Sequence, residues 1–536
     1  MYFSGTFLRT SLLASLVAIG FTPSAQGDVT YSTTTQFSGG TFINLNPNSD
    51  ELQINTWAQT KTADPPVLPY LWVACSGRGT VVRIATADHY SPVDQKPVQA
   101  GDILGEYRAG PDACGSGPGF GQDPSRTTVD FDGNVWVANR ANLEAFECED
   151  DLCGHVVKIA SGLAFQWVDR NCNGVLDTST GLGDIRAWPN PDGLCTSDDV
   201  RFAQDELILL YQPILGTGTR TVAVDRENNV WIGGYDNGWH GLVDGQTGAL
   251  LRDEGVLPCG GYGGVVDCHG VLWSARSLED FDVLLRFDPN TVPPDPDCIS
   301  IVNSYGLAVD TLGNIWNSQF QQQTVTKLCP AGGILGTFPS GGDGSRGVVV
   351  TPEDDDVWIA NSFSNNVAHL PNEGQPLEAT VSVGYEPTGV AVDSTGKIWV
   401  TNLSANNVAR IDPVTNSIDL GPINLNLDPF QSWHGAAGPY NYSDMTGVNL
   451  YATIAPAGVW TVVADSGDVG TVWDRIHWAA TIGAGTITVQ ARADNETYDL
   501  GEHRYIDIES NEALNCALTG QFLQIRVQLN TNCRQE

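Results

Sequence analysis

The sequence predicts an all-β protein, in which a seven-bladed β-propeller is followed by a C-terminal β-sandwich. Three observations favour this fold class: a composition rich in Gly and Trp, a tryptophan-bearing repeat of about 42 residues, and alternating strand-like segments near the C-terminus. The chain of 536 residues contains 59 Gly and 15 Trp, and 41% of its residues are hydrophobic. This apolar fraction is enough for a large core and excludes a globally disordered chain.

The charge balance restricts the partners of this protein. The chain has 26 Lys+Arg against 63 Asp+Glu, which gives a net charge of -37 at pH 7, although only 17% of its residues are charged. An acidic surface repels phosphate groups, so we expect no nucleic-acid partner. We also expect no membrane span, because no segment is long and apolar enough to cross a bilayer.

Residues 1–27 have the features of a secretory signal peptide. Arg9 precedes an apolar stretch over residues 11–21, and small residues lead up to Asp28. The stretch is shorter than the roughly 20 residues that a membrane helix needs. We therefore expect cleavage before Asp28 and an exported protein, whether extracellular, at the cell surface or periplasmic; a retained N-terminal anchor is the alternative.

Residues 28–64 are expected to form one or two strands that pair with the sandwich or help close the propeller. The propeller itself is expected over residues 65–425, where an aromatic residue marks each unit. The aligned tryptophans are Trp72, Trp136, Trp231, Trp273, Trp316, Trp358 and Trp399. The last five recur at intervals of 41 to 43 residues, so seven units of blade length are predicted. A β-solenoid is less suitable because its repeats are shorter.

Each unit contains an apolar run, a short turn and a second run that carries the tryptophan. In five units an Asp lies six residues before the Trp: Asp130, Asp225, Asp267, Asp310 and Asp393. An Asp at this place can accept hydrogen bonds from the turn backbone. We expect this structural role in preference to metal binding, because the residue recurs at the same position of successive blades.

The repeat G-[VL]-A-V-D-x-x-G-[NK]-[VI]-W-V resembles the NHL and streptogramin lyase (virginiamycin B lyase) group of propellers. The resemblance implies the propeller fold and, in the lyases, elimination chemistry with a magnesium ion and a His placed just before an inner strand. The corresponding positions of this chain are Ser125, Arg220, Tyr262, Tyr305, Arg346 and Thr388, none of which is His. We therefore assign no catalytic residue and favour a non-catalytic binding or interaction protein; the alternative is a metal-dependent lyase or lactone hydrolase acting in the channel.

The propeller rim is the expected ligand site. The start of each inner strand and the end of the next strand lie on the same rim in this fold. The candidate residues are Arg220, Tyr262, Tyr305, Arg346, Thr388, Asn139, Arg276, Gln319, Asn361 and Asn402. Arg and Tyr side chains suit ligands with hydroxyl or carboxylate groups, such as a carbohydrate or a protein surface. Ordinary solvated loop polarity is the alternative interpretation.

An insertion at residues 161–220 contains the pattern D-x-N-x-N-G-x-x-D. Its oxygen donors are spaced as in calcium loops, and Gly at the sixth position permits the sharp turn. The expected Ca²⁺ ligands are Asp169, Asn171, Asn173, Val175 through its carbonyl, Asp177 and Asp184. Asp198 or Asp199 are alternatives to Asp184, because the twelfth position is Thr180 instead of an acidic residue. A structural calcium ion is predicted, and an Asx-rich turn without metal is the alternative.

The C-terminal part is expected to contain a linker over residues 426–440 and a β-sandwich over residues 441–536. The opening Y-S-D-M-T-G of the second region resembles β-sandwich modules appended to bacterial surface propellers. That resemblance implies carbohydrate or surface attachment, and a structural cap or spacer is equally compatible with the sequence.

The chain has 12 cysteines, and in an exported protein these favour disulfides. Sequence proximity suggests five local pairs: Cys148–Cys153, Cys259–Cys268, Cys172–Cys195, Cys298–Cys329 and Cys516–Cys533. Cys75 and Cys114 would remain to pair with each other, although spacing alone leaves other connectivities open. The absence of C-x-x-C excludes a zinc ribbon, a thioredoxin-like site and c-type haem attachment.

Overall fold

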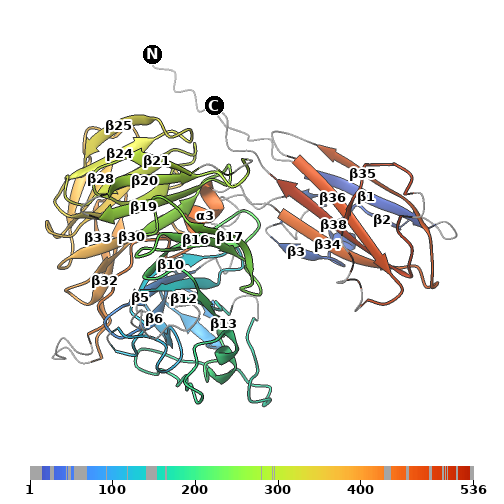
Figure 1. Ribbon diagram of the computed structural model, residues 1–536, viewed down its shortest axis with the longest axis horizontal. Helices are drawn as coiled ribbons and strands as arrows, with labels where there is room; N and C mark the ends of the chain where they lie inside the picture. Colours follow the sequence, from blue (N-terminus) through green and yellow to red (C-terminus); the bar gives the residue numbers. More distant parts are fainter. Residues whose placement is uncertain are drawn as a thin grey trace. The chain divides into compact units, whose positions relative to one another are not determined.

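A computed structural model of the chain describes residues 15–23, 29–43, 45, 50–53, 69–91, 93–117, 119–140, 154–162, 166–278, 281–291, 294, 296–427, 436–453, 458–481, 486–497, 500, 503, 505–514 and 517–530. The chain forms two compact units. One unit spans Trp57–Ile454, and the other joins Met1–Thr56 to Ala455–Cys533. Both units are built almost entirely from strands (Figure 1).

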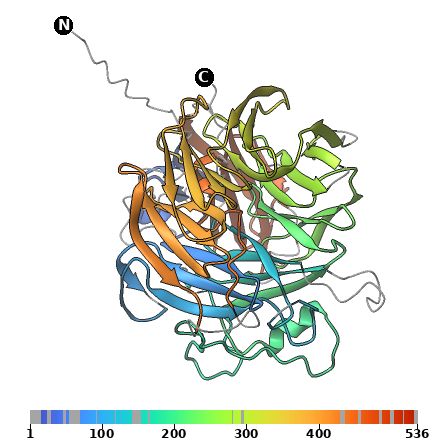
Figure 2. The same ribbon diagram turned by 90° about the vertical axis from the view of Figure 1, so that its left-hand side faces the viewer.

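The larger unit is a seven-bladed propeller, as predicted. Its blades are seven antiparallel sheets arranged around a central channel (Figure 2). The first blade contains β5 (Tyr70–Cys75), β6 (Thr80–Ala85) and β9 (Ile103–Arg108), with the hairpin β7 (His89–Ser91) and β8 (Lys96–Val98) between the last two. The second contains β10 (Pro124–Val129), β11 (Val135–Asn139), β12 (Gly154–Ile159) and β13 (Ile208–Ile214).

The other five blades each have four strands in sequential order. The third and fourth blades are β14 (Thr219–Val224), β15 (Val230–Gly234), β16 (Trp239–Val243) and β17 (Leu250–Val256), then β18 (Gly263–Val266), β19 (Leu272–Leu278), β20 (Phe281–Phe287) and β21 (Pro296–Ser300). The fifth and sixth are β22 (Ser304–Val309), β23 (Ile315–Gln319), β24 (Thr324–Leu328) and β25 (Ile334–Pro339), then β26 (Ser345–Val350), β27 (Val357–Asn361), β28 (Asn366–Leu370) and β29 (Ala379–Ser382). The seventh is β30 (Pro387–Val392), β31 (Ile398–Asn402), β32 (Asn407–Asp412) and β33 (Ser417–Asn424).

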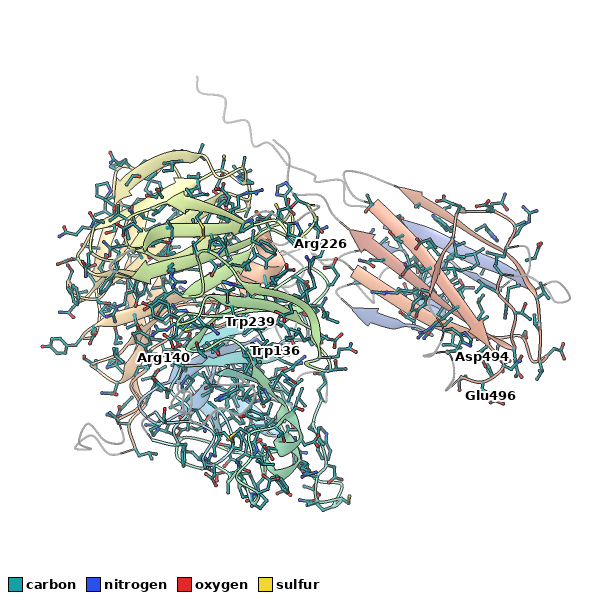
Figure 3. All side chains as sticks on the ribbon, in the orientation of Figure 1. Trp136, Arg140, Arg226, Trp239, Asp494 and Glu496 are labelled. Carbon is teal, nitrogen blue, oxygen red and sulfur yellow. A yellow bond between two sulfur atoms is a disulfide. The ribbon has the colours of Figure 1, made fainter. Side chains whose placement is uncertain are left out.

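The repeated tryptophans and aspartates hold each blade together, as predicted. All seven tryptophans are buried, Trp72 on β5 and the other six on the second strand of their blades, where Trp136 lies among packed side chains (Figure 3). Asp130, Asp225, Asp267, Asp310 and Asp393 each accept hydrogen bonds from the backbone N–H groups two and four residues later. In three blades the same carboxylate also accepts from the indole N–H, at 2.7 Å for Asp393 and Trp399. The Asp therefore closes the hairpin and positions the core tryptophan.

The first blade receives its innermost strand from the far end of the propeller chain. Among the described residues, β5 has no preceding partner strand, and residues 437–446 lie along its free edge instead. The backbone of Cys75 pairs with that of Pro439 in an isolated antiparallel β-bridge, and the N–H of Trp72 donates to the Met445 carbonyl at 2.9 Å. We call residues 437–446 the closing strand. It joins the last blade to the first, and α3 (Val448–Thr453) follows it.

This arrangement corrects the predicted boundary between the two units. Residues 441–447, including the Y-S-D-M-T-G sequence from Tyr442 onward, lie in the propeller unit instead of opening the sandwich. The predicted linker 426–440 is corrected in part, because residues 437–440 belong to the closing strand and residues 428–435 lie outside the described residues. The physical reason is that the second strand of a blade needs a partner on each side, and among the described residues no strand next to the first blade in sequence supplies the inner partner of β5.

The smaller unit is a two-layer sandwich of N-terminal and C-terminal strands. One sheet joins β1 (Ser15–Pro23), β2 (Val29–Tyr31), β4 (Leu52–Gln53) and β35 (Trp473–Thr481). The other has the order β3 (Thr41–Ile43), β34 (Gly458–Asp465), β38 (Phe522–Asn530), β36 (Thr486–Asp494), β37 (Ile506–Asp507). The short α1 (Thr34–Phe37) lies between β2 and β3. Ile19, Trp460 and Ile525 are among the core residues that the two sheets share.

The N-terminal segments therefore pair with the sandwich, which was one of the two expectations for residues 28–64. The predicted signal peptide also contributes a strand: β1 pairs with β35 from Ser15↔Thr481 to Pro23↔Trp473. Signal-peptide cleavage stays a prediction, and it now carries a structural consequence, because cleavage before Asp28 removes β1. Within the described part of the chain, no helix is long and apolar enough to cross a membrane.

The predicted disulfides are largely wrong. Cys114 bonds Cys195, and Cys259 bonds Cys298, so the pairs Cys75–Cys114, Cys172–Cys195, Cys259–Cys268 and Cys298–Cys329 do not form. The pairs Cys148–Cys153 and Cys516–Cys533 lie outside the described residues. The observed partners are 81 and 39 residues apart in sequence but within 6.2 Å between Cα atoms, because folding of the blades, not sequence spacing, brings them together.

Candidate functional site

Four tyrosine hydroxyls meet at one mouth of the propeller channel. Tyr262 immediately precedes β18, and Tyr305 is the second residue of β22. Tyr440 and Tyr442 come from the closing strand, where residues two apart point to the same side. The Tyr262 hydroxyl donates to the Tyr305 hydroxyl at 2.7 Å, the Tyr305 and Tyr440 oxygens are 2.8 Å apart, and the Tyr442 hydroxyl donates to Tyr440 at 3.3 Å. The chain thus builds a continuous phenol network from three distant segments.

Three arginines from different inner strands surround this network. Arg126 lies on β10, Arg220 on β14 and Arg346 on β26. The Cζ atoms of Arg126 and Arg220 lie 2.9 Å from the Tyr442 ring centroid and 4.5 Å from that of Tyr262, respectively. The Arg346 Cζ lies 5.6 Å from the Tyr440 ring centroid. We call these three arginines and four tyrosines the Tyr–Arg cluster.

The cluster has unused hydrogen-bond donors. The Nε–H groups of Arg126, Arg220 and Arg346 are buried and have no hydrogen-bond partner among the described residues. Arg346 contacts Glu386 at 3.2 Å, whereas no described carboxylate forms an ion pair with Arg126 or Arg220. Buried donors without partners cost free energy, about 1–3 kcal/mol each and more when charged. An anion that accepts from these groups would remove this cost.

The cluster also changes the acidity of its members. Burial raises the pKa of Tyr262, Tyr305 and Tyr442. Burial would raise the pKa of Tyr440 as well, but the positive charges of Arg346, Arg220 and Arg126 and the hydrogen bond with Tyr262 lower it to about 7. Tyr440 is therefore the one described tyrosine of the cluster whose hydroxyl loses its proton near neutral pH.

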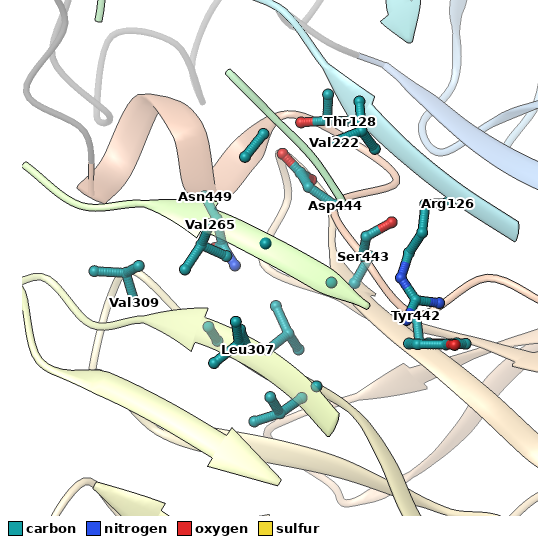
Figure 4. A pocket seen from close by; sticks show the side chains of 18 of the residues that line it. Arg126, Thr128, Val222, Val265, Leu307, Val309, Tyr442, Ser443, Asp444 and Asn449 are labelled. Carbon is teal, nitrogen blue, oxygen red and sulfur yellow. The ribbon is translucent and has the colours of Figure 1, made fainter. Parts of the chain in front are cut away.

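A cavity of about 70 Å³ continues from the cluster into the channel (Figure 4). Arg126, Tyr442 and Asp444 line it together with apolar residues of the inner strands, such as Val265 and Leu307. This volume holds a few water molecules or one small polar group. Burial raises the pKa of the Asp444 carboxyl group, which accepts hydrogen bonds from the N–H groups of Thr446 and Gly447.

Aromatic side chains connect the cluster to the surface. Phe320 stacks on Tyr305 with ring centroids 5.0 Å apart, and Phe363 follows at 5.4 Å from Phe320. Phe363 is 57% exposed, and Tyr385 on the loop before β30 is 73% exposed. Exposed aromatic rings beside buried cationic groups suit a ligand that has both a ring and a negative charge.

The structure brings together four of the ten predicted rim residues: Arg220, Tyr262, Tyr305 and Arg346. Thr388 is buried, and its hydroxyl donates to the Pro439 carbonyl of the closing strand at 3.1 Å. The other five bond to their own blades or to adjoining loops: Asn139 to Ala109, Arg276 to Gly260, Gln319 to Val302, Asn361 to Ser340 and Asn402 to Asn407. These five side chains support the loops of the rim, whereas the ends of the inner strands surround the channel.

Sequence reasoning missed Arg126, Tyr440 and Tyr442. Arg126 is one residue beyond Ser125, the position aligned with Arg220, and a register shift in β10 lies between Pro124 and Arg126. Tyr440 and Tyr442 were placed in the linker and the sandwich. Trp72 lacks the Asp that lies six residues before the tryptophan in five other units, and this break in the repeat was a usable signal that the first blade is completed from elsewhere in the chain.

The predicted calcium loop folds around its own oxygen atoms. The Asp169 carboxylate accepts from the N–H groups of Asn173 and Gly174 at 3.1 and 2.9 Å, and Gly174 has φ +73° as the turn requires. The Asp177 carboxylate accepts from the side-chain amides of Asn171 and Asn173, which lower its pKa. The N–H of Val175 donates to the Asn173 side chain at 2.7 Å. The loop contains carboxylate and amide oxygens, which are the ligand atoms that Ca²⁺ prefers.

Of three acidic residues close to this loop, one binds the loop and the other two form hydrogen bonds elsewhere in the insertion. The buried Glu206 holds both ends of the loop, because its carboxylate accepts from the N–H groups of Arg170 and Asp177 at 3.0 and 2.8 Å. The Asp184 carboxylate instead accepts from the N–H and hydroxyl of Thr180, at 3.1 and 3.0 Å. The 3₁₀ helix η2 (Ser197–Phe202) follows, and Asp199 accepts from the N–H of Thr196, so it caps this helix.

One further group of metal-ligating side chains lies on the sixth blade: Asp356, His369 and Glu378. The ring nitrogens of His369 contact Asp356 at 3.0 Å and the Asn416 side chain at 2.8 Å. The ring also stacks on Trp358 at 3.9 Å. Both nitrogens are thus engaged in hydrogen bonds that hold the outer strands, and these contacts raise the pKa of His369 above its usual value despite burial.

Comparisons with known proteins agree with the fold. No family model matches this sequence, and no curated protein matches it. Similar solved structures include virginiamycin B lyase from Staphylococcus aureus, with 15% identity, a TM-score of 0.40, and coverage of 58% of this chain and 85% of that one. A putative 6-phosphogluconolactonase from Bacteroides uniformis has 14% identity, a TM-score of 0.42, and coverage of 66% and 95%. These likenesses concern the fold alone.

Proposed function

We propose that this chain is an exported, non-catalytic binding protein whose propeller mouth takes an organic carboxylate that carries a ring, such as an acidic sugar. The observation that carries the proposal is the set of three buried arginine Nε–H groups without partners in the Tyr–Arg cluster. Carboxylates accept charge-assisted hydrogen bonds from guanidinium groups, which are stronger than neutral ones. The protein has a net charge of -37, so a site with converging arginines contrasts with the charge of the whole chain.

The shape of the mouth supports a ligand with a ring. The aromatic side chains from Tyr305 through Phe320 to the exposed Phe363 provide flat faces on which a sugar or aromatic ring packs. The cavity below the cluster accommodates a small polar group and not a whole ligand. The carboxylate is therefore expected at the cluster and the ring against the aromatic side chains.

Isothermal titration calorimetry tests this function with matched pairs of probes. Glucuronate and benzoate are expected to bind, whereas glucose and benzyl alcohol, which lack the carboxylate, are not. Arg220→Gln is expected to weaken binding about tenfold or more, because a charged hydrogen bond is lost. Arg201→Gln is the control, since Arg201 is exposed and lies on the insertion. Failure of both carboxylates to bind, or equal effects of the two substitutions, would overturn the proposal.

The alternative function is that of a metal-dependent lyase or lactone hydrolase, and it can be tested with the same protein samples. Proton NMR would follow a linear lactone and the carboxylate probes after addition of magnesium. Product formation that Arg220→Gln abolishes and Arg201→Gln preserves would replace the binding function with catalysis. Probes that bind and remain unchanged support the non-catalytic function.

We also propose a structural calcium ion in the loop from Asp169 to Asp177. Its support is the calcium-type spacing of carboxylate and amide residues in a loop that Glu206 anchors at both ends. Calcium is expected to raise the thermal unfolding temperature, and a chelator to lower it, because an ion bound only to the folded state stabilises that state. Asp169→Ala should remove this response and Asp192→Ala, an exposed control in the same insertion, should keep it. A response that is equal in both variants would refute the calcium site.

A further inference from the structure

The Tyr440 oxygen is the shared acceptor of the phenol network. A tyrosine hydroxyl has one hydrogen to donate and two lone pairs to accept with. Tyr262 donates to Tyr305, which leaves the Tyr305 hydrogen for Tyr440, and Tyr442 also donates to Tyr440. The Tyr262 oxygen lies 3.3 Å from the Tyr440 oxygen as well. The Tyr305 and Tyr442 hydroxyls thus donate to the Tyr440 oxygen, and the arginine charges around it favour the form that has lost its own hydrogen.

Positive charge faces this oxygen from several elements. Arg126, Arg220 and Arg346 approach from three inner strands, and the Arg140 Cζ after β11 lies 4.7 Å from the Tyr440 ring centroid. The nearby acids are engaged elsewhere. Glu386 pairs with Arg346, Asp123 pairs with Arg140, and Asp444 accepts from the backbone N–H groups of Thr446 and Gly447. Among the described residues, Tyr440 itself is the group that supplies negative charge to Arg126 and Arg220.

We infer that the Tyr–Arg cluster binds its carboxylate together with a proton, which is taken up by the Tyr440 oxygen. This inference rests on the proposed function and deepens it. In the empty site, the phenolate of Tyr440 offsets part of the arginine charge. When a carboxylate enters, its charge takes over this role and repels the phenolate, so Tyr440 recovers its hydrogen. The site then carries the same net charge with and without the ligand.

The proton and the ligand must influence each other equally, because binding free energies are linked. Although burial raises it, the arginine charges lower the pKa of Tyr440 to about 7 in the empty site, against an ordinary value of 10.0. The bound carboxylate offsets the arginine charges and moves this pKa upward. Affinity should consequently fall as the pH rises above about 7, by up to about tenfold per pH unit. Below that pH Tyr440 is already protonated, and affinity should depend little on pH.

Calorimetry with glucuronate measures the proton directly. Titrations at about pH 8.5 in Hepes and in Tris, whose ionisation enthalpies differ, should show uptake of nearly one proton per ligand in the unmodified protein, since most Tyr440 is ionised there. Tyr440→Phe should bind glucuronate with no proton uptake and with nearly constant affinity across this range. Tyr90→Phe is the control, because Tyr90 on β7 is an exposed tyrosine outside the Tyr–Arg cluster and outside the aromatic side chains of the mouth. It should retain the full proton uptake.

Ultraviolet difference spectroscopy provides a second measurement that needs no ligand. The unmodified protein should show one tyrosine that ionises near neutral pH, and Tyr440→Phe should lack it. Arg346→Gln should move this ionisation to higher pH, because one of the lowering charges is removed. The unmodified protein and Arg346→Gln keep the inference testable if Tyr440→Phe folds poorly.

The outcomes separate the two proposals. Glucuronate binding without proton uptake, or equal uptake in Tyr440→Phe, would overturn the proton-coupled inference and leave the binding function standing. The absence of a tyrosine that ionises near neutral pH would do the same. If glucuronate and benzoate both fail to bind, the proposed function and the inference fall together.

Discussion

Removal of the Asn441 side chain should weaken closure of the propeller. Asn441 is fully buried in the closing strand and contacts three other strands. Its side-chain amide donates to the Trp72 carbonyl of β5 at 3.0 Å and to the Thr127 hydroxyl of β10 at 2.9 Å. Its own carbonyl accepts from the Thr401 hydroxyl at 3.1 Å. The substitution Asn441→Ala leaves this backbone contact intact and removes both side-chain donors.

The expected loss follows from these two contacts. Each net hydrogen bond contributes about 1 kcal/mol, and a buried group left without a partner adds a further penalty, so the free energy of unfolding should fall by about 2 to 4 kcal/mol. For a unit of about 400 residues, with an unfolding entropy near 2.1 cal/mol/K per residue, this corresponds to a decrease of about 2 to 5 °C in the unfolding temperature. Residual structure in the unfolded chain would make this decrease in the unfolding temperature smaller.

Differential scanning calorimetry is the appropriate assay, because it separates the transition of the propeller from that of the sandwich where the two differ. Asn290→Ala is the control, since Asn290 is exposed on the outside of the fourth blade. Its effect should remain within about 0.5 kcal/mol. If Asn441→Ala unfolds at the same temperature as the control, the closing strand does not hold the ring in the way that its hydrogen bonds indicate.

Three other predictions follow from the same structure. Asp393→Ala removes the acceptor for the Thr395 and Lys397 N–H groups and for the Trp399 indole, and it should cost about 2 to 4 kcal/mol in a denaturant titration; an unchanged midpoint would contradict the structural role of the turn. Burial lowers the pKa of His240 to about 4, so the unfolded state binds a proton that the folded state excludes, and stability should fall by up to about 3 kcal/mol between about pH 6.5 and pH 4. His240→Gln should flatten this dependence, and an identical slope in both proteins would refute it. Mass spectrometry of the exported protein should find Asp28 at its N-terminus, and retention of β1 would show that the signal peptide is not removed.

The repeat pattern was sufficient to predict much of the propeller. Strand alternation, the Asp turns and the core tryptophans all act within one hairpin, so their spacing appears directly in the sequence. The rim positions Arg220, Tyr262, Tyr305 and Arg346 could be predicted for the same reason, because each holds the same place in its blade. Thr388 holds that place too, but its neighbour is the closing strand, and no local pattern reveals a neighbour so distant in the chain.

The sequence by itself determined the fold class, the blade count and the turns, since these depend on contacts between residues a few positions apart. Only the tertiary structure decided how the ring closes, which cysteines pair and which groups complete the channel mouth. Asn441 reaches Trp72 across 369 residues, and the same strand brings Tyr440 and Tyr442 to the arginines. Such contacts are selected by the geometry of the closed ring, where β5 must find an inner partner and a buried charge must find a counter-charge. For that reason the acidity of Tyr440 belongs to the folded propeller and has no counterpart in the sequence.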